Sequence, residues 1–145
     1  MKWITRKNAK VDRIACPWLI QKYIDSNPRF LYVDSEEVLQ QAANLDAISY
    51  DAPGAKYTHR DGKCTFEVLM EEFRLNDPAL EKLARIVHGA DIEKDLLITQ
   101  ESAGLRRVAE GFAMTVTDDQ EKLRLQFPLY DALYAYCVAH PLIKD

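Results

Sequence analysis

The chain has 145 residues, and 48% of them are hydrophobic, which is ample for one continuous core. We therefore expect a single domain over residues 1–145. The 19 Lys and Arg residues against 23 Asp and Glu residues give a net charge of -4, which argues against nucleic acid as a partner, because phosphate binding needs a concentrated basic face. Neither the apolar segment of a signal peptide nor a long apolar span is evident, so we expect a cytoplasmic protein without a membrane partner.

Short segments rich in aromatic and β-branched residues alternate with helical patterns in the first half of the chain. The first helix is expected over 17–24, since Pro17 suits the first helical position and a start at Asp12 would place it inside the helix at a cost of roughly 3 kcal/mol. Asp34 and Glu37 have the spacing of a capping box for the second helix. The order β-α-β-α-β-β predicts a small, mostly parallel sheet, with strands over 2–5, 30–33, 47–50 and 56–59.

The second half of the chain has helical spacing throughout. Thr65 and Asp77 are expected to cap two helices, the second of which ends at Gly89. Three further helices are expected, over 102–114, after a capping box at Thr117, and from Pro128. The fold class is therefore α/β in the broad sense (α+β), with a helical second half packed on the small sheet.

The three cysteines, Cys16, Cys64 and Cys137, are odd in number and widely spaced. This pattern indicates neither a disulfide framework nor a zinc ribbon, so we expect reduced thiols.

A first group of polar residues, Asp12, Arg13 and Cys16, falls between the first expected strand and helix. Pro17 favours an extended Cys16, which would put the thiol at a helix entrance where the macrodipole favours a thiolate. A loop at the carboxyl end of a parallel strand is also where such folds place their ligands, so these residues are candidates for binding a substrate or oxyanion. The alternative is a buried Cys16 beside a structural Asp12–Arg13 ion pair.

A second group contains Asp51, His59, Cys64 and Glu67. Imidazole, thiolate and carboxylate are competent ligands for a divalent transition metal, and the turn after His59 would bring it close to Glu67. We therefore expect one metal site for Zn, Fe or Mn from these four residues and Asp91. In the alternative, Cys64 is packed, Glu67 stabilises a helix N-terminus and His59 is solvated.

Further residues have weaker patterns. His88 in the last turn of a helix is expected to stabilise the carbonyl end, whereas Asp91 either caps the next segment or points into the same cleft. The adjacent Arg106 and Arg107 have the paired donors that recognise an oxyanion, although two adjacent arginines on a helix more often face solvent. Tyr130 and Tyr134 share one helix face, which favours packing.

Several segments, taken in order, are similar to one known family. The chain resembles the C-terminal domain of the ChrB-type chromate-resistance proteins, and residues 12–20 carry the most specific part of that resemblance. The similar segments are K-W-I-T-R at 2–6, D-R-I-A-C-P-W-L-I at 12–20, F-L-Y-V at 30–33, I-S-Y-D at 48–51, T-H-R-D-G-K-C-T-F-E at 58–67, D-P-A-L at 77–80, H-G-A-D at 88–91 and P-L-Y-D-A-L-Y-A at 128–135.

The resemblance implies an association with bacterial chromate resistance, in which longer members carry an additional N-terminal part and are regarded as chromate-responsive regulators. We expect this chain to correspond to the C-terminal part alone, without the DNA-binding function of the longer proteins. Glu67 stands where the family leads us to expect Asp. Carried over residue by residue, the resemblance gives candidate positions without roles: Asp12, Arg13, Cys16, Asp51, His59, Cys64 and Asp91.

Three functions stay open at this point. The first is a ligand-sensing or metal- and oxyanion-binding module that responds to chromate. The second is a small metal-dependent redox enzyme that protects against chromate or oxidative stress. The third is an interaction domain whose tyrosine-rich last helix, including Tyr130, binds another protein or forms a homodimer.

Overall fold

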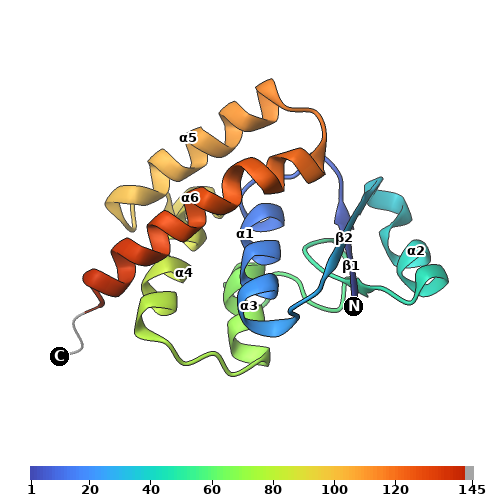
Figure 1. Ribbon diagram of the computed structural model, residues 1–145, viewed down its shortest axis with the longest axis horizontal. Coiled ribbons are helices and arrows are strands. Elements are labelled where there is room, and N and C mark those ends of the chain that lie inside the picture. Colours follow the sequence, from blue (N-terminus) through green and yellow to red (C-terminus); the bar gives the residue numbers. More distant parts are fainter. Residues whose placement is uncertain (143–145) are drawn as a thin grey trace.

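The computed structural model describes residues 1–142. A three-stranded parallel sheet lies toward one side of the molecule (Figure 1). Its central strand pairs with both neighbours, since Trp3 lies opposite Phe30 on one side and Ile48 on the other. The parallel arrangement and the first three expected strands are confirmed. The strands are β1 (Lys2–Arg6), β2 (Arg29–Val33) and β3 (Ile48–Ser49), in the order β2-β1-β3.

The fourth strand expected over 56–59 is wrong. The backbone of Tyr57 bonds to the edge of β3 only briefly, accepting from the Asp51 N–H at 2.8 Å and donating to the Ser49 carbonyl at 3.3 Å. Positive φ angles at Asp51 (48°) and Gly54 (76°) turn the chain out of the sheet plane before this contact. The segment therefore leaves the sheet edge as a loop that carries His59.

Helix α1 (Asp12–Leu19) begins five residues before the expected start, so Pro17 lies inside it. Proline has no N–H for the carbonyl of Arg13 one turn earlier, but the Tyr32 hydroxyl donates to that carbonyl at 2.7 Å. A strand residue thus replaces the missing helical hydrogen bond. The helix then continues as a π-helical turn over Ile20–Ile24.

The short helix α2 (Val38–Leu45) follows a 3-10 turn, and the capping box expected from Asp34 does not form. The Asp34 side chain instead contacts the Lys7 ammonium at 2.5 Å. Helix α2 packs on one face of the sheet. There Ile4 of β1 forms a small apolar cluster with Val38 and Ala42 of α2. Its position apart from the other helices is visible in Figure 1.

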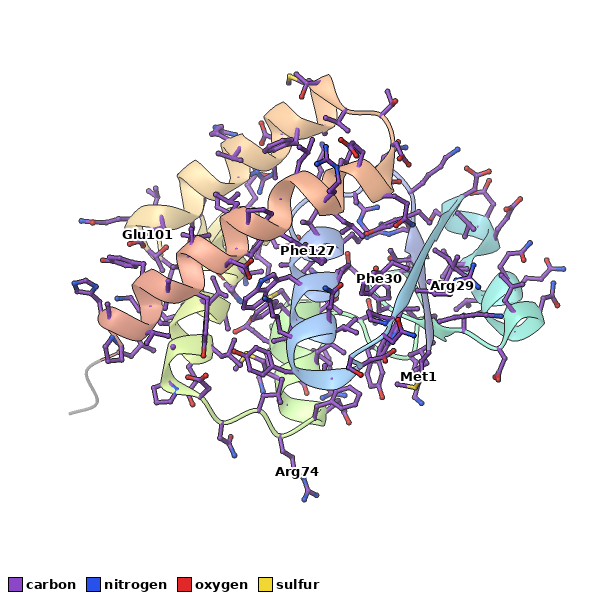
Figure 2. The ribbon with its side chains drawn as sticks, viewed as in Figure 1. Met1, Arg29, Phe30, Arg74, Glu101 and Phe127 are labelled. Carbon is purple, nitrogen blue, oxygen red and sulfur yellow. The ribbon has the colours of Figure 1, made fainter. Side chains whose placement is uncertain are left out.

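The remaining helices cover the opposite face of the sheet and enclose the main core (Figure 1). Helix α6 packs against α1 and α4, and α5 packs against α4. Phe30 of β2 and Phe127 of α6 lie at one edge of this core (Figure 2). The helices are α3 (Thr65–Glu72), α4 (Pro78–Asp91), α5 (Gln100–Thr115) and α6 (Asp119–Ala139).

Two expected helix boundaries are wrong for the same kind of reason. Gly89 does not end α4, which continues to Asp91; it is needed because a Cβ there would lie 2.4 Å from Oγ of Ser102 in α5. Pro128 does not open a helix but lies inside α6, on its exposed side, where water can satisfy the Arg124 carbonyl. In both cases the surroundings decide the role of the residue.

The caps of α3 and α4 bear on the site described below. Asp77 caps α4 as expected, through a 2.8 Å bond from the Ala79 N–H. Thr65, however, is the first residue of α3 rather than its cap, and Cys64 takes the cap position. The N–H and hydroxyl of Thr65 are consequently available to two buried aspartates.

The packing role expected for the tyrosines of the last helix is confirmed. Tyr130 is completely buried, and the rings of Tyr130 and Tyr134 lie 6.3 and 5.7 Å from that of Trp18. Tyr130 therefore offers no surface for self-association. Within residues 1–142, no helix is both long and apolar enough to cross a membrane.

Candidate functional site

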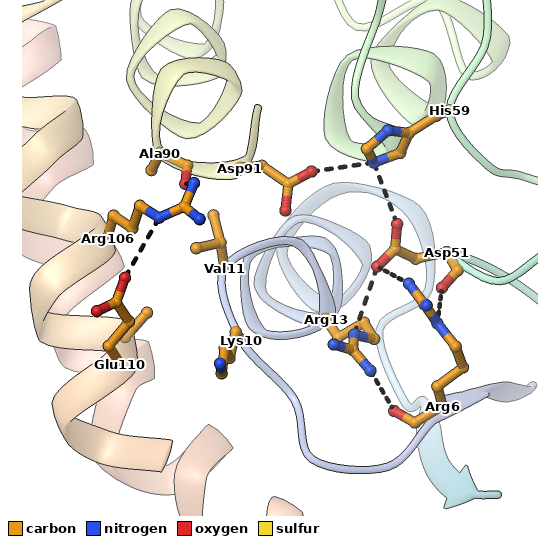
Figure 3. Close-up of a pocket in the computed structure, with 11 residues that line it drawn as sticks. Arg6, Lys10, Val11, Arg13, Asp51, His59, Ala90, Asp91, Arg106 and Glu110 are labelled. Carbon is orange, nitrogen blue, oxygen red and sulfur yellow. Dashed lines mark hydrogen bonds and ion pairs between the residues drawn. The ribbon is translucent and has the colours of Figure 1, made fainter. Parts of the chain in front are cut away.

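A polar cleft of about 290 Å³ opens where the end of β1, the start of α1 and the loop after β3 meet the end of α4 and the middle of α5 (Figure 3). Cationic and anionic side chains line it together. The charged lining residues are Arg6, Lys10, Arg13, Asp51, His59, Asp91, Arg106 and Glu110.

His59 lies among three carboxylates in this cleft. Its Nε2 atom is 3.0 Å from Oδ2 of Asp91 and 3.4 Å from oxygens of both Asp12 and Asp51. The three aspartates come from α4, α1 and the loop after β3, so the fold gathers them from distant parts of the chain. Figure 3 shows His59 turned toward Asp51 and Asp91. The structure thus brings four of the expected site residues together.

Asp12 is completely buried, yet one of its oxygens has no hydrogen-bond partner among residues 1–142. Oδ2 accepts from the backbone N–H of Thr65 at 2.8 Å, whereas Oδ1 accepts from no donor in this part of the chain. Burial, and then repulsion from Asp91, raise the pKa of Asp12 well above its usual value. A buried carboxylate oxygen without a donor is costly, and a cation is the partner that would compensate it best.

Asp51 is held in place by both its side chain and its backbone. Burial acts to raise its pKa, but hydrogen bonds from His59 and Thr65 outweigh burial and lower it. The Thr65 hydroxyl donates to Oδ1 at 2.7 Å, and Nε of Arg13 lies 3.5 Å from Oδ2. The Asp51 carbonyl accepts from Nε of Arg6 at 3.0 Å. Asp51 therefore fixes the two arginines at the cleft.

Two residues of the cleft have strained backbones. Val11, just before α1, has φ 22°, and Asp51 has φ 48°. Such conformations cost about 1–3 kcal/mol each, and for a β-branched residue a positive φ is exceptional. Strain of this kind persists only where the surroundings enforce it, so the contacts around Val11 and Asp51 must fix the two loops that end at the cleft.

The three carboxylates strongly favour a positive charge at His59. Contacts first with Asp12, and then with Asp51 and Asp91, raise its pKa to about 12 although burial opposes this. The imidazolium supplies one positive charge to a group of three acids. A divalent cation would supply two, and the same atoms are competent ligands for it.

Arg6, Arg13 and Arg106 line the cleft around the aspartates, which form its acidic floor. Arg13 is held by the carbonyls of Arg6 and Lys7 at 3.2 and 3.0 Å, and burial lowers its pKa. Arg106 contacts Glu110 at 3.3 Å and the Ala90 carbonyl at 3.4 Å. Arg106 therefore lines the cleft, as Figure 3 shows.

Arg107 does not share that position. Its side chain is 66% exposed and pairs only with Glu110 among the described residues. The adjacent pair of arginines thus divides between the cleft and solvent.

Cys16 lies in the second turn of α1 rather than at a helix entrance, which favours the buried alternative over the reactive thiolate. The side chain is completely buried, and burial together with the charge of Asp12 raises the pKa of its thiol. Cys64 and Cys137 are likewise buried free thiols. None of the three is a ready nucleophile.

Cys64 and Glu67 do not join the cluster around His59. They lie instead with His88, and one ligand atom from each of the three falls within 4.8 Å of the others. The single metal site expected from five residues is therefore divided into two clusters. His88 was expected only to stabilise a helix end, and its i, i+3 spacing from Asp91 would have assigned it to the other cluster.

Arg6 is a cleft residue that the sequence patterns did not indicate. It ends β1, and its guanidinium lies 3.7 Å from Oδ2 of Asp51. Its place at the carboxyl end of the central strand was the available signal.

Comparison with known proteins assigns the family. The model of the ChrB C-terminal domain matches residues 3–137. The chain belongs to this family. Protein ChrB of Cupriavidus metallidurans (strain ATCC 43123 / DSM 2839 / NBRC 102507 / CH34) is 32% identical over 136 residues, which cover 93% of this chain and 40% of that protein. No solved structure matches.

The resemblance to ChrB-type chromate-resistance proteins is thereby confirmed over nearly the whole chain. The matched region of the family model contains both clusters, from Asp12 to Asp91. Because the chain spans about two-fifths of the length of that relative, the match concerns this domain and not the whole ChrB protein.

Proposed function

We propose that this ChrB-type domain binds a divalent transition metal through Asp12, His59 and Asp91 and presents it to a small oxyanion of the chromate type. The unpartnered Oδ1 atom of Asp12, completely buried beside His59, is the observation that carries the proposal. One donor atom from each of the three side chains lies within 4.8 Å of the others. The metal would be a Lewis acid in the cleft.

The donor set favours manganese, iron or zinc. Carboxylates suit hard cations and imidazole suits later transition metals, so a mixture of one imidazole and two carboxylates is typical of the metals between these extremes. Asp51 would position the centre rather than complete it, since its oxygens already contact Thr65 and Arg13. Thr65 in turn holds Asp12 through its backbone N–H.

The arginines give the cleft its selectivity for an anion. Arg13 and Arg106 offer planar donors for the oxygens of a tetrahedral dianion, and Lys10 adds a further positive charge. The aspartates on the floor would repel the same anion unless a cation compensated them. The proposal therefore makes oxyanion binding conditional on the metal.

The relation to the ChrB family supplies the choice of oxyanion. Chromate is the ligand that the family's role in chromate resistance suggests, and sulfate and phosphate are its competitors of similar shape and charge. In this function the chromate-bound form of the domain would differ from the free form and would be recognised by another component of a resistance system. Its role would be that of a sensing module.

Titration calorimetry on metal-free protein tests this function. Mn²⁺, Fe²⁺ and Zn²⁺ would be titrated first, and chromate, sulfate and phosphate then with and without the bound metal. We expect His59→Ala and Asp91→Asn each to lose one equivalent of bound metal. The control Asp46→Asn should retain it, because Asp46 is an exposed residue at the end of α2. An unchanged number of bound metal equivalents in both cluster variants, or chromate binding without any metal, would contradict the proposal.

A metal-dependent redox enzyme is the second candidate. The His59 side chain is 46% exposed and that of Asp91 is 19% exposed, so a bound metal would keep a coordination position open toward the cleft. Elemental analysis of purified protein, followed by superoxide decay measured with each metal, separates the two candidates. Turnover that is lost in His59→Ala favours the enzyme, whereas chromate binding without turnover favours the sensing module.

A further inference from the structure

A second cluster of metal-ligating side chains lies where the start of α3 meets the last turns of α4. Cys64 caps α3 and Glu67 is three residues later, so both lie on its first turn. The Cys64 N–H donates to Oε1 of Glu67 at 3.0 Å, which fixes these two residues relative to each other. His88 reaches them from α4, with Nδ1 at 2.5 Å from Oε1 of Glu67.

The other nitrogen of His88 is held by a different residue. Nε2 lies 2.7 Å from Oδ2 of Asp95, in the 3-10 turn Glu93–Asp95 that follows α4. A carboxylate on one ring nitrogen keeps the proton there and leaves the lone pair of the opposite nitrogen for a metal, as is usual for histidine ligands. Once a metal displaces the proton that Nδ1 shares with Glu67, Asp95 would keep the remaining proton on Nε2 and leave the Nδ1 lone pair facing Cys64 and Glu67.

We propose that Cys64, Glu67 and His88 bind one Zn²⁺ ion, with Asp95 as the residue that positions His88. One thiolate, one imidazole and one carboxylate form a donor set that zinc accepts and that magnesium and calcium do not favour. This site is separate from the centre proposed at Asp12, His59 and Asp91, because within residues 1–142 no side chain belongs to both clusters.

The observed distances are compatible with zinc. In a tetrahedral site with these donors the ligand atoms lie roughly 3.3–3.6 Å apart. The three donors lie within 4.8 Å of one another, so zinc would draw the more widely spaced of them together by up to roughly 1.2 Å and widen the 2.5 Å separation of His88 Nδ1 from Glu67 Oε1 by roughly 0.9 Å. The Glu67 side chain, which is 26% exposed, has room to rotate for this change.

The site would be reached from one side only. Cys64 is completely buried, whereas the side chains of Glu67 and His88 are 26% and 12% exposed. Three protein ligands with one partly open face leave the fourth position for water, which is the arrangement of exchangeable rather than structural zinc sites.

Cobalt substitution tests the proposal, because Co²⁺ reports its ligands by absorption. Titrating metal-free protein with Co²⁺ is expected to give a near-ultraviolet thiolate-to-cobalt charge-transfer band that saturates at one equivalent and is displaced by Zn²⁺. The band should disappear in Cys64→Ser and persist in the control Cys137→Ser. It should also persist in His59→Ala, which removes the other centre.

Asp95→Asn tests the positioning role separately. We expect zinc affinity to fall about 10- to 100-fold, with the band intact at saturating Co²⁺, because the ligands remain while His88 loses its orientation. No band in the wild type, a band that survives Cys64→Ser, or one that is lost in His59→Ala would overturn the proposal.

Folding of Cys64→Ser is checked by circular dichroism. A second measurement on the wild type avoids this dependence altogether. At a urea concentration below the unfolding midpoint, where buried thiols become exposed transiently, Zn²⁺ should slow alkylation of Cys64 relative to Cys16 and Cys137, as read by mass spectrometry of the digested protein. Equal alkylation of Cys64 with and without Zn²⁺ would also overturn the proposal.

Discussion

Replacing Asp12 by Asn separates a functional from a structural role for this buried carboxylate. The amide keeps an oxygen for the Thr65 N–H, which Asp12 now accepts at 2.8 Å, and it removes the negative charge. The loss of the 3.4 Å contact with His59 is offset, because Asp51 and Asp91 remain beside that imidazole. The loss of the charge also relieves the burial and repulsion that raise the pKa of Asp12.

We therefore expect the metal-free Asp12→Asn protein to be within about 1 kcal/mol of the wild type in free energy of unfolding. Removing one partner of a buried structural ion pair would instead cost about 3–5 kcal/mol. For a chain of this length 1 kcal/mol corresponds to roughly 2–4 °C in Tm. The two roles thus differ by an amount that a thermal or urea unfolding curve resolves easily.

The metal-bound state should behave in the opposite way. A metal present at about 100 times its Kd stabilises the folded wild type by about 2.7 kcal/mol. In Asp12→Asn that increment should vanish, since a carboxylate ligand has become an amide. Unfolding curves with and without Mn²⁺ give both quantities. Destabilisation of the metal-free variant by 3 kcal/mol or more, or an undiminished effect of Mn²⁺, would refute the reasoning.

The other predictions concern packing and pH. Gly89→Ala should lower the free energy of unfolding by about 1–3 kcal/mol, because the new methyl group would lie 2.4 Å from Oγ of Ser102. A methyl group at Gly104 of α5 would meet no atom within 4 Å, so Gly104→Ala should leave the free energy of unfolding unchanged or raise it by about 0.5–1 kcal/mol. Equal changes for Gly89→Ala and Gly104→Ala in urea unfolding would contradict this. Asp131 accepts from the Trp18 indole at 2.8 Å, which lowers its pKa, so its contribution is present above the unfolded pKa and lost as the pH falls through the folded one. Asp131→Asn should therefore flatten the decline of stability at acid pH, as followed by tryptophan fluorescence, and an unchanged decline would show that this carboxylate contributes nothing there.

The sheet could be predicted because its strands are short apolar segments with few alternative structures. The start of α1 could not, because the cost of Pro17 inside a helix depends on a partner for the Arg13 carbonyl, and Tyr32 supplies it from another strand. Gly89 shows the same limit. A glycine is required at this position, but the reason is the close approach of α5 and not the end of α4.

The cluster around His59 could be anticipated in part, because Asp12 and Asp51 follow parallel strands whose carboxyl ends meet at one edge. The assignment of Cys64 and Glu67 to the same cluster failed because the direction of the first turn of α3 is set by packing. Thr65 points to the aspartates, while Cys64 and Glu67, one residue before it and two residues after it, lie with His88. A pattern of spacing along the chain does not reveal such a division.

The position of Thr65 has a consequence for how the two clusters would behave together. Its N–H and hydroxyl hold two aspartates of one cluster, while the preceding residue, Cys64, is a ligand of the other. On α4, His88 and Asp91 are likewise one turn apart and divided between the clusters. Ions bound at both would therefore be thermodynamically linked, and whatever factor the first changes in the affinity of the second, the second must change in that of the first.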